Sequence, residues 1–436
     1  MKQLLFFFTM TMCIFAVACH REDLPGPEDR EDLTTPLTIE AIDRGIISIL
    51  NLQEQTILYS KNGGEKQQVK SDHIDINVDP GDKIAFYGDN ENYYLSDIYY
   101  LHFYSSPQAY VYGNIMSLVR SSGYEKATAL KGSLARLFWC NQQLVNHPER
   151  SVILPATNLS RGCYREMFYG CSGLTRASEL PATRLAESCY ESMYSGSGVV
   201  SSPDLPAMDL AKNCYQGMFL NCSSLVEASA LPATTLAPHC YEKMFYDCGA
   251  LKKAPALPAQ SLAEWCYSMM FAYCKSLVEA PELPATTMEY QAYSGMFSDC
   301  NRLAHAPALP ATSLAKACYG GMFQNCISLT KAPALPATEL QPNCYWGMFH
   351  GCSRLETAPD LPARVLAEDC YHAMFYGCTA LGSVKCLAED LGYGSPTAEW
   401  MVGVRSSGTF VKSATMNTWP SGESGIPKGW NIVDAG

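Results

Sequence analysis

The sequence predicts a repeat solenoid preceded by a small all-β domain, and three observations carry that prediction. Cys-Tyr pairs recur every 26 residues, apart from one 25-residue interval between Cys189 and Cys214. Each unit contains an apolar stripe followed by a short proline-containing segment. Residues 37–119 lack this period and alternate between polar and apolar residues. One stripe and one short segment cannot enclose a core alone, but stacked copies can.

The repeating unit is well defined. It reads Leu-Pro-Ala-x-x-Leu-Ala-x-x-Cys-Tyr-x-x-Met-Phe-x-x-Cys-x-x-Leu-x-x-Ala-Pro-x, as in residues 257–282. Nine units are complete, although Ala292 replaces the first cysteine in one of them. A degenerate unit lies near residues 134–159. We therefore expect the solenoid to occupy residues 120–385.

The spacing within a unit predicts a short helix and a short strand. Leu236, Cys240, Met244 and Cys248 recur every four residues, which is typical of one apolar helix face. Gly, Asn or Asp precedes the second cysteine in eight of the nine units, at the expected end of the helix. The following Leu-x-x-Ala-Pro-x segment predicts a strand. Proline donates no ladder hydrogen bond, so this parallel ladder should be interrupted and its strands very short. The prolines concerned are Pro255, Pro281, Pro307, Pro333 and Pro359.

These motifs resemble the BspA-type leucine-rich repeat of surface lipoproteins in the Bacteroides phylum. The resemblance rests on Met-Phe-x-x-Cys-x-x-Leu and Leu-x-x-Ala-Pro-x-Leu-Pro and covers residues 134–386. It implies a leucine-rich-repeat-like fold and a cell-surface protein associated with adhesion, and it carries no catalytic residues to transfer. Residues 386–436 resemble the C-terminal end of such proteins, and we expect them to cap the solenoid.

The first residues predict export and a lipid anchor. An apolar run from Leu4 to Val17 is too short to span a bilayer and has the length of a signal-peptide core. It ends on Ala-Val-Ala-Cys, which resembles a lipobox, so residues 1–18 would be the signal peptide and Cys19 the acylated residue. Residues 19–36 are rich in acidic residues and predict a flexible tether. We expect a protein anchored in the outer membrane and exposed at the cell surface.

Residues 37–119 predict a small β-sandwich-like domain. Asn62-Gly63-Gly64 lies between two apolar segments and indicates a hairpin. Asp79-Pro80-Gly81-Asp82 indicates a second turn between alternating segments. Several short strands at this spacing are typical of a sandwich.

Composition and motifs argue against several functions. The net charge of −12, without clusters of Lys and Arg, argues against nucleic-acid binding. The chain has no Cys-x-x-Cys and no His-Glu-x-x-His, and its repeat histidines lie in different slots, so we expect no metal site. We expect no cofactor and no catalytic residues.

The repeated cysteines and tyrosines have alternative interpretations. The two cysteines of a unit are eight residues apart, about 12 Å along a helix, which is too far for a disulfide. Ladders of reduced, buried thiols are favoured, although bridges between units are compatible with a stacking distance of about 5 Å. The tyrosine after the first cysteine would form a structural stack with its hydroxyl outward, or alternatively a strip that contacts sugars.

The variable positions of the strand segment predict the binding surface. In a solenoid such positions lie in line and form an extended surface. The candidate ligand-binding residues are Arg176, Glu227, Lys253, Glu279, His305, Lys331 and Thr357. We expect protein or glycan ligands. An envelope scaffold that assembles partner proteins, a nutrient-binding lipoprotein that captures glycans, and an enzyme remain alternatives.

Overall fold

The computed structural model describes residues 32–90, 93, 96 and 98–435. Within it, Leu33–Gly436 forms one compact unit. The signal peptide and residues 19–31 of the tether, Cys19 among them, lie outside the described residues.

Two sheets, in which most strands pair antiparallel, form the region before the repeats. The larger sheet has the order β10-β8-β1-β6-β3-β4, with β11 also beside β8, and the smaller has the order β5-β2-β7. Their strands are β1 (Thr38–Ala41), β2 (Gly45–Asn51), β3 (Ile57–Lys61), β4 (Gln67–Gln68), β5 (His73–Val78), β6 (Lys83–Gly88), β7 (Leu101–Ser105), β8 (Ala109–Asn114), β10 (Leu144–Asn146) and β11 (Val152–Ile153). Both turns expected from the sequence are present, since Asn62 and Gly63 join β3 to β4 and Gly81 lies between β5 and β6.

The two sheets share a core with the first coil of the solenoid. Phe86 of β6 stacks on Phe103 of β7, with ring centroids 4.2 Å apart. Phe103 in turn contacts Phe138, which stacks on Phe168 of the first complete unit. The β8–β10 pairing is parallel and joins the sheet to the start of the repeats. The sheet region therefore covers the apolar interior at this end of the stack.

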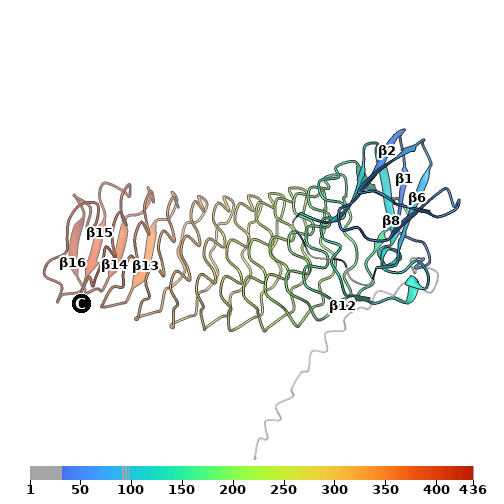
Figure 1. Ribbon diagram of the computed structural model, residues 1–436. Helices are drawn as coiled ribbons and strands as arrows, with labels where there is room; N and C mark the ends of the chain where they lie inside the picture. Colours follow the sequence, from blue (N-terminus) through green and yellow to red (C-terminus); the bar gives the residue numbers. More distant parts are fainter. Residues whose placement is uncertain (1–31, 91–92, 94–95, 97, 436) are drawn as a thin grey trace, which may run out of the picture. The chain divides into compact units, whose positions relative to one another are not determined.

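The repeats form stacked coils of about 26 residues per turn, which confirms the predicted solenoid (Figure 1). Their strand segments pair mainly through single parallel bridges such as Lys253–Glu279 and Glu279–His305. The proline that follows two residues later limits each pairing, as expected. A longer parallel sheet forms where the repeats end. It comprises β13 (Thr357–Leu361), β14 (Ser383–Cys386), β15 (Thr409–Lys412) and β16 (Asn431–Asp434).

The predicted helix of each unit is wrong. The part of the chain that the structure describes contains no α-helix, and its helical segments are the 3₁₀ turns η1 (Ile115–Leu118) and η2 (Tyr124–Lys126). The remaining short strands are β9 (Ala129–Leu130) and β12 (Asn158–Leu159), which pair with each other. In place of a helix, the segment from the alanine of the Leu-Ala pair to the second cysteine forms a series of tight turns. We call this segment the turn ribbon; in one coil it spans residues 237–248.

Backbone hydrogen bonds in the turn ribbon alternate between two kinds. The N–H groups of Cys240, Glu242 and Met244 each donate to the carbonyl three residues earlier, which closes tight turns. The N–H groups of the intervening residues, such as Tyr241 and Lys243, donate to carbonyls of the next coil. Because the two kinds alternate, each N–H group from His239 to Cys248 has a backbone partner, which a buried backbone requires.

A left-handed residue at every fourth position explains why a helix does not form. His239, Lys243 and Asp247 have φ values of 57°, 54° and 55°. A positive φ at the third position of a turn is the type II geometry, whereas a right-handed helix has negative φ throughout. Turns repeated every four residues place the Cys-Tyr and Met-Phe pairs inward, as a helix face would. The apolar spacing therefore fits both structures.

The inward side chains form ladders through the whole stack. Tyr164 stacks on Tyr190 at 6.0 Å, and the same contact is repeated to Tyr371. The Phe column is equally regular, as in the 5.6 Å stack of Phe245 on Phe271. The expectation of outward tyrosine hydroxyls is wrong, because these tyrosines are at most 1% exposed. The backbone of the turn ribbon directs the entire tyrosine side chain, including its hydroxyl, into the core beside the preceding cysteine.

Residues 387–435 continue the stack and cover its end. Trp400 is fully buried and contacts the rings of Tyr371 and Phe375 in the last repeat coil. Trp419 stacks on the other side of Trp400, with ring centroids 5.7 Å apart. The Trp400 Nε1–H donates to the Gly425 carbonyl. The apolar interior of the last repeat is thereby shielded from water.

Candidate binding surface

The strand-row surface consists of the seven candidate residues predicted above, and the solenoid brings them into one register. Lys253 is bridged to Glu279, and Glu279 to His305. Lys331 is bridged to Thr357 farther along the stack. All seven side chains are exposed. Coil stacking therefore places residues that are 26 positions apart in the sequence directly beside one another.

Arg176 lies at the start of this surface and is held in a different way. Its guanidinium Nη2 donates to the carbonyls of His147 and Arg150 at 2.8 and 3.1 Å. Its backbone N–H donates to the Asn146 side chain. These bonds turn the arginine toward the segment before the first repeat, so it contributes to the surface mainly at its edge.

Shallow grooves lie between consecutive coils on the same face. One is lined by Lys253 and Glu279 together with the Ala-Pro residues that follow each of them. A second is lined by His305 and Lys331 in the same way. Their floors are alanine and proline, and the variable charged residue stands at the rim. An extended chain lying along the face could contact several rims at once.

The charges of the strand-row surface alternate. Glu227, Lys253 and Glu279 follow one another, and Lys331 lies two coils beyond Glu279. Neighbouring exposed charges of opposite sign partly neutralise one another, so the surface has no uniform field that would select a polyanion. It favours ligands that also carry mixed polar groups.

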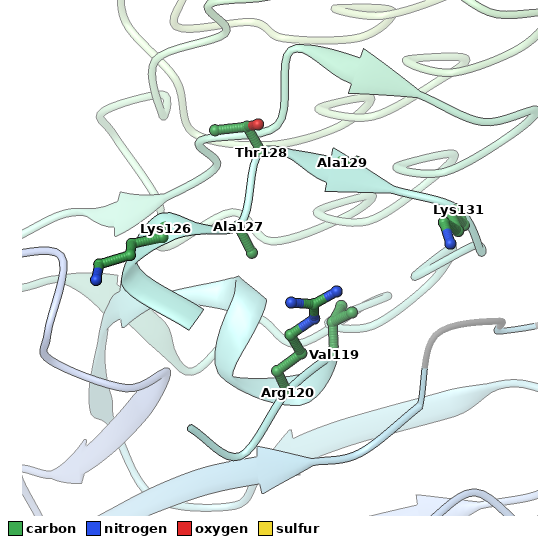
Figure 2. A pocket seen from close by; sticks show the side chains of 7 residues that line it. All are labelled: Val119, Arg120, Lys126, Ala127, Thr128, Ala129 and Lys131. Carbon is green, nitrogen blue, oxygen red and sulfur yellow. The ribbon is translucent and has the colours of Figure 1, made fainter. Parts of the chain in front are cut away.

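A second hollow lies outside the solenoid repeats, and sequence reasoning missed it. It is lined by Val119 and Arg120, which directly follow η1, and by residues from the end of η2 to Lys131 after β9 (Figure 2). Arg120 follows η1, Lys126 ends η2 and Lys131 follows β9, so three short elements place cationic side chains around one hollow. Arg120 and Lys131 also take part in other polar interactions. The three residues are spread over 12 positions without a motif, which leaves little signal in the sequence.

The cysteine ladders hold protonated thiols. All eighteen described cysteines are free, and seventeen of them are buried. Burial raises the pKa of the Cys266 and Cys318 thiols to about 12. Since the thiolate is the nucleophilic form, these groups are poorly suited to catalysis.

The second cysteine of a unit has a specific hydrogen-bonding role. Cys274 Sγ donates to the Phe245 carbonyl of the preceding coil at 3.1 Å, and Cys300 donates to Phe271 in the same way. The thiol therefore acts as a compact apolar group with a weak donor. Ser197, which occupies this slot in one coil, lies 3.6 Å from the Cys222 sulfur.

Two further observations concern metals and membranes. Among the described residues, no group of three or more His, Cys, Asp or Glu side chains is arranged to hold a metal ion. No helix within the described ranges is long and apolar enough to cross a bilayer.

The fold and surface define a class of protein: a solenoid of stacked turn-ribbon coils with a buried aromatic interior and an exposed row of variable residues. Comparison with protein-family models, curated proteins and solved structures found no match.

Proposed function

We propose that this protein is a non-enzymatic surface lipoprotein that binds protein or glycan ligands through the strand-row surface. The observation that carries the proposal is the register of its exposed variable residues, one per coil, over a uniform buried framework. Such a surface offers many separately changeable contacts along one line. The leucine-rich-repeat character and the kinship with BspA-type adhesins belong to the same proposal and rest on the sequence motifs.

The binding proposal can be tested with a surface variant. We would replace Lys253, Glu279 and Lys331 by serine, the residue that occupies this row naturally at Ser201. The matched control replaces three exposed charged residues of the turn ribbon: Glu264, Lys316 and Glu368. On an array of extracellular-matrix proteins and glycans, the row variant should lose binding and the control should retain it. Equal binding by the two variants would contradict the proposed surface.

The anchor and its orientation need a separate test. We propose that Cys19 carries the lipid, so Cys19→Ser should release the protein from the membrane fraction and abolish its labelling by radioactive palmitate. Protease treatment of intact cells should remove the solenoid if it faces outward. Complete protection in intact cells, followed by digestion after lysis, would favour the alternative of an inward-facing envelope scaffold.

A further inference from the structure

The two grooves of the strand-row surface lie two coils apart. The first lies between the coils of Lys253 and Glu279, and the second between the coils of His305 and Lys331. Coils joined by parallel bridges, as Lys253 and Glu279 are, lie about 4.8 Å apart in the hydrogen-bonding direction. Equivalent points in the two grooves are therefore separated by about 9.6 Å along the stack.

The floor of each groove is small and apolar. Ala254 and Ala280 line the first groove, and the equivalent residues Ala306 and Ala332 line the second. The prolines of this segment have no N–H group, so they add no donor to the floor. Ala308, which also lines the second groove, is exposed and has no side chain beyond its Cβ atom. Each groove therefore suits a short apolar side chain.

Charged side chains stand at the rims of the grooves in a fixed order. Along the stack, Lys253 precedes the first groove, Glu279 and His305 lie between the two grooves, and Lys331 follows the second. All four side chains are exposed. In the part of the chain that the structure describes, Lys253, Glu279 and Lys331 form no ion pair. Their charges are therefore available to a ligand that lies over the grooves.

We propose that the strand-row surface binds a polyproline-II segment of another protein, with one apolar residue of the segment in each groove. A polyproline-II helix has three residues per turn and rises about 3.1 Å per residue, so every third side chain recurs at about 9.3 Å. This period agrees with the groove separation to within about 0.3 Å. The inference rests on the proposed function and deepens it by naming the ligand class.

Other regular backbones fit the groove spacing less well. In a β-strand, side chains on one face recur at about 6.6 Å, which lies between one and two coil spacings. In an α-helix, successive turns are about 5.4 Å apart, which exceeds one coil spacing by about 0.6 Å at every turn. Polyproline II also has no internal hydrogen bonds, so its carbonyls can accept hydrogen bonds from the ammonium groups of Lys253 and Lys331.

The rim charges define the charge pattern of the ligand. The ligand residue that follows a groove-bound residue lies about 3.1 Å farther along the stack, close to the row residue that follows each groove. These row residues are Glu279 and Lys331. A lysine after the first groove-bound residue and a glutamate after the second would therefore pair with them. The segment Pro-Lys-Pro-Pro-Glu has this pattern, and Glu-Pro-Pro-Lys-Pro has it when the ligand runs in the opposite direction.

The test measures binding of fluorescent peptides to the full chain by anisotropy. The mixed-charge peptide is Pro-Pro-Lys-Pro-Pro-Glu-Pro-Pro, made also in reverse order, and the acidic peptide has glutamate in place of its lysine. We expect one order of the mixed-charge peptide to bind the wild type with a Kd below about 1 mM. A peptide with the same charges and glycine in place of every proline should bind roughly tenfold more weakly, because it is not held in the polyproline-II conformation.

Two variants test the rim and the groove separately. Glu279→Lys should reverse the charge preference, so that the acidic peptide binds more tightly than the mixed-charge peptide by about fivefold. Ala308→Leu fills the second groove and should weaken binding of both peptides by roughly tenfold. Ala308→Ser is the matched control, because it keeps the side chain small, and it should bind as the wild type does. Both positions are exposed, so these variants should fold.

The outcomes separate this inference from the proposed function. The inference is overturned if neither order of the mixed-charge peptide binds the wild type at about 1 mM, or if the glycine peptide binds as tightly. It is also overturned if Glu279→Lys leaves the charge preference unchanged. A protein or glycan on the array that needs the strand row, without any peptide binding, overturns this inference alone. If neither the array nor the peptides reveal a ligand that needs the strand row, the proposed function fails as well.

Discussion

Tyrosine is used in the inner column although some of its hydroxyl groups find no protein partner. The hydroxyls of Tyr164, Tyr190, Tyr241 and Tyr319 are buried without a hydrogen bond in the described structure. Tyr194, in the neighbouring column, differs, because its hydroxyl accepts the Ser178 N–H at 2.9 Å. A buried polar group without a partner retains its desolvation cost.

Tyr241→Phe should therefore stabilise the fold, by about 1 kcal/mol, since it removes an unsatisfied hydroxyl and keeps the stacked ring. Tyr194→Phe should destabilise it by about the same amount, because the Ser178 N–H loses its acceptor. Urea unfolding followed by circular dichroism gives both values. A loss of stability in Tyr241→Phe would show that its hydroxyl has a partner.

The buried thiols predict a dependence of stability on alkaline pH. Burial raises the pKa of Cys163, Cys266 and Cys352 to about 12, whereas an unfolded cysteine titrates near 8.5. A raised folded pKa gives stability that is complete below pH about 8.5 and is lost as the pH rises toward 12. Many such thiols act together, so the fall should be steep.

The urea midpoint should accordingly be constant from pH 7 to about 8 and should then drop sharply by pH about 10. Replacing Cys266 and Cys318 by alanine, the natural residue at Ala292, should make the drop shallower. A midpoint that stays level up to pH 10 would contradict the buried, protonated state of the ladders.

At the scale of the element, the turn ribbon depends on left-handed residues at three positions of each coil. Glycine occupies such positions at Gly321 and Gly347, but Lys243, Met269 and Ala317 adopt the same conformation with a side chain. A residue with a Cβ pays for that conformation by about 1–2 kcal/mol, and glycine does not.

Lys243→Gly should therefore stabilise the protein by about 1 kcal/mol, and Gly347→Ala should destabilise it by a similar amount. Space does not limit the second change, because the nearest atom to a Cβ at Gly347 is 3.9 Å away. Urea unfolding of the two variants, with Lys243→Ala as the control for losing the ammonium group, separates the backbone effect. Stabilisation by Gly347→Ala would imply a helical backbone there.

The same element shows how far the sequence predicts this fold. The 26-residue period, the inward columns and the short strand bridges all follow from the repeat, because stacking forces equivalent residues together. The helix was wrong because spacing by four fits both a helix and a chain of turns. Gly217, Gly295 and Pro238 carried the missing signal, since glycine and proline recur at turn positions that a helix interior disfavours.

The candidate surfaces were predictable to different degrees. The line of Lys253, Glu279 and His305 followed from the period alone. The exposure of Trp346 did not follow from the period, because a repeat of residue types does not show whether the neighbouring coil covers a given ring. The orientation of the tyrosine hydroxyls also depended on the true geometry of the ribbon.

At the scale of the whole molecule, one apolar core runs from the N-terminal sheets to Trp430. Its ends are the weak points of a stacked structure, because the last coil has a neighbour on one side only. Trp400 supplies the missing neighbour of the last repeat coil, and Trp419 packs over Trp400 with ring centroids 5.7 Å apart.

Trp400→Ala should reduce the unfolding free energy by about 3–5 kcal/mol, since it opens a large cavity at the end of the core. The exposed Trp346, replaced by alanine, should change stability much less and serves as the control. Thermal unfolding of the two variants tests this. Similar melting temperatures for both would mean that the terminal segment does not support the stack.

The hydrogen bonds of the turn ribbon also give the molecule an electrical direction. Between two adjacent coils, the N–H groups of His239, Tyr241, Lys243, Phe245 and Asp247 all donate toward the C-terminal side. Bonds of the strand row, such as Val278 N–H to Lys252 O, run the other way, but the ribbon supplies five per coil in this stretch. Aligned peptide dipoles add along an axis, as they do in a helix. The end of the stack near the C-terminus is therefore the more electropositive pole.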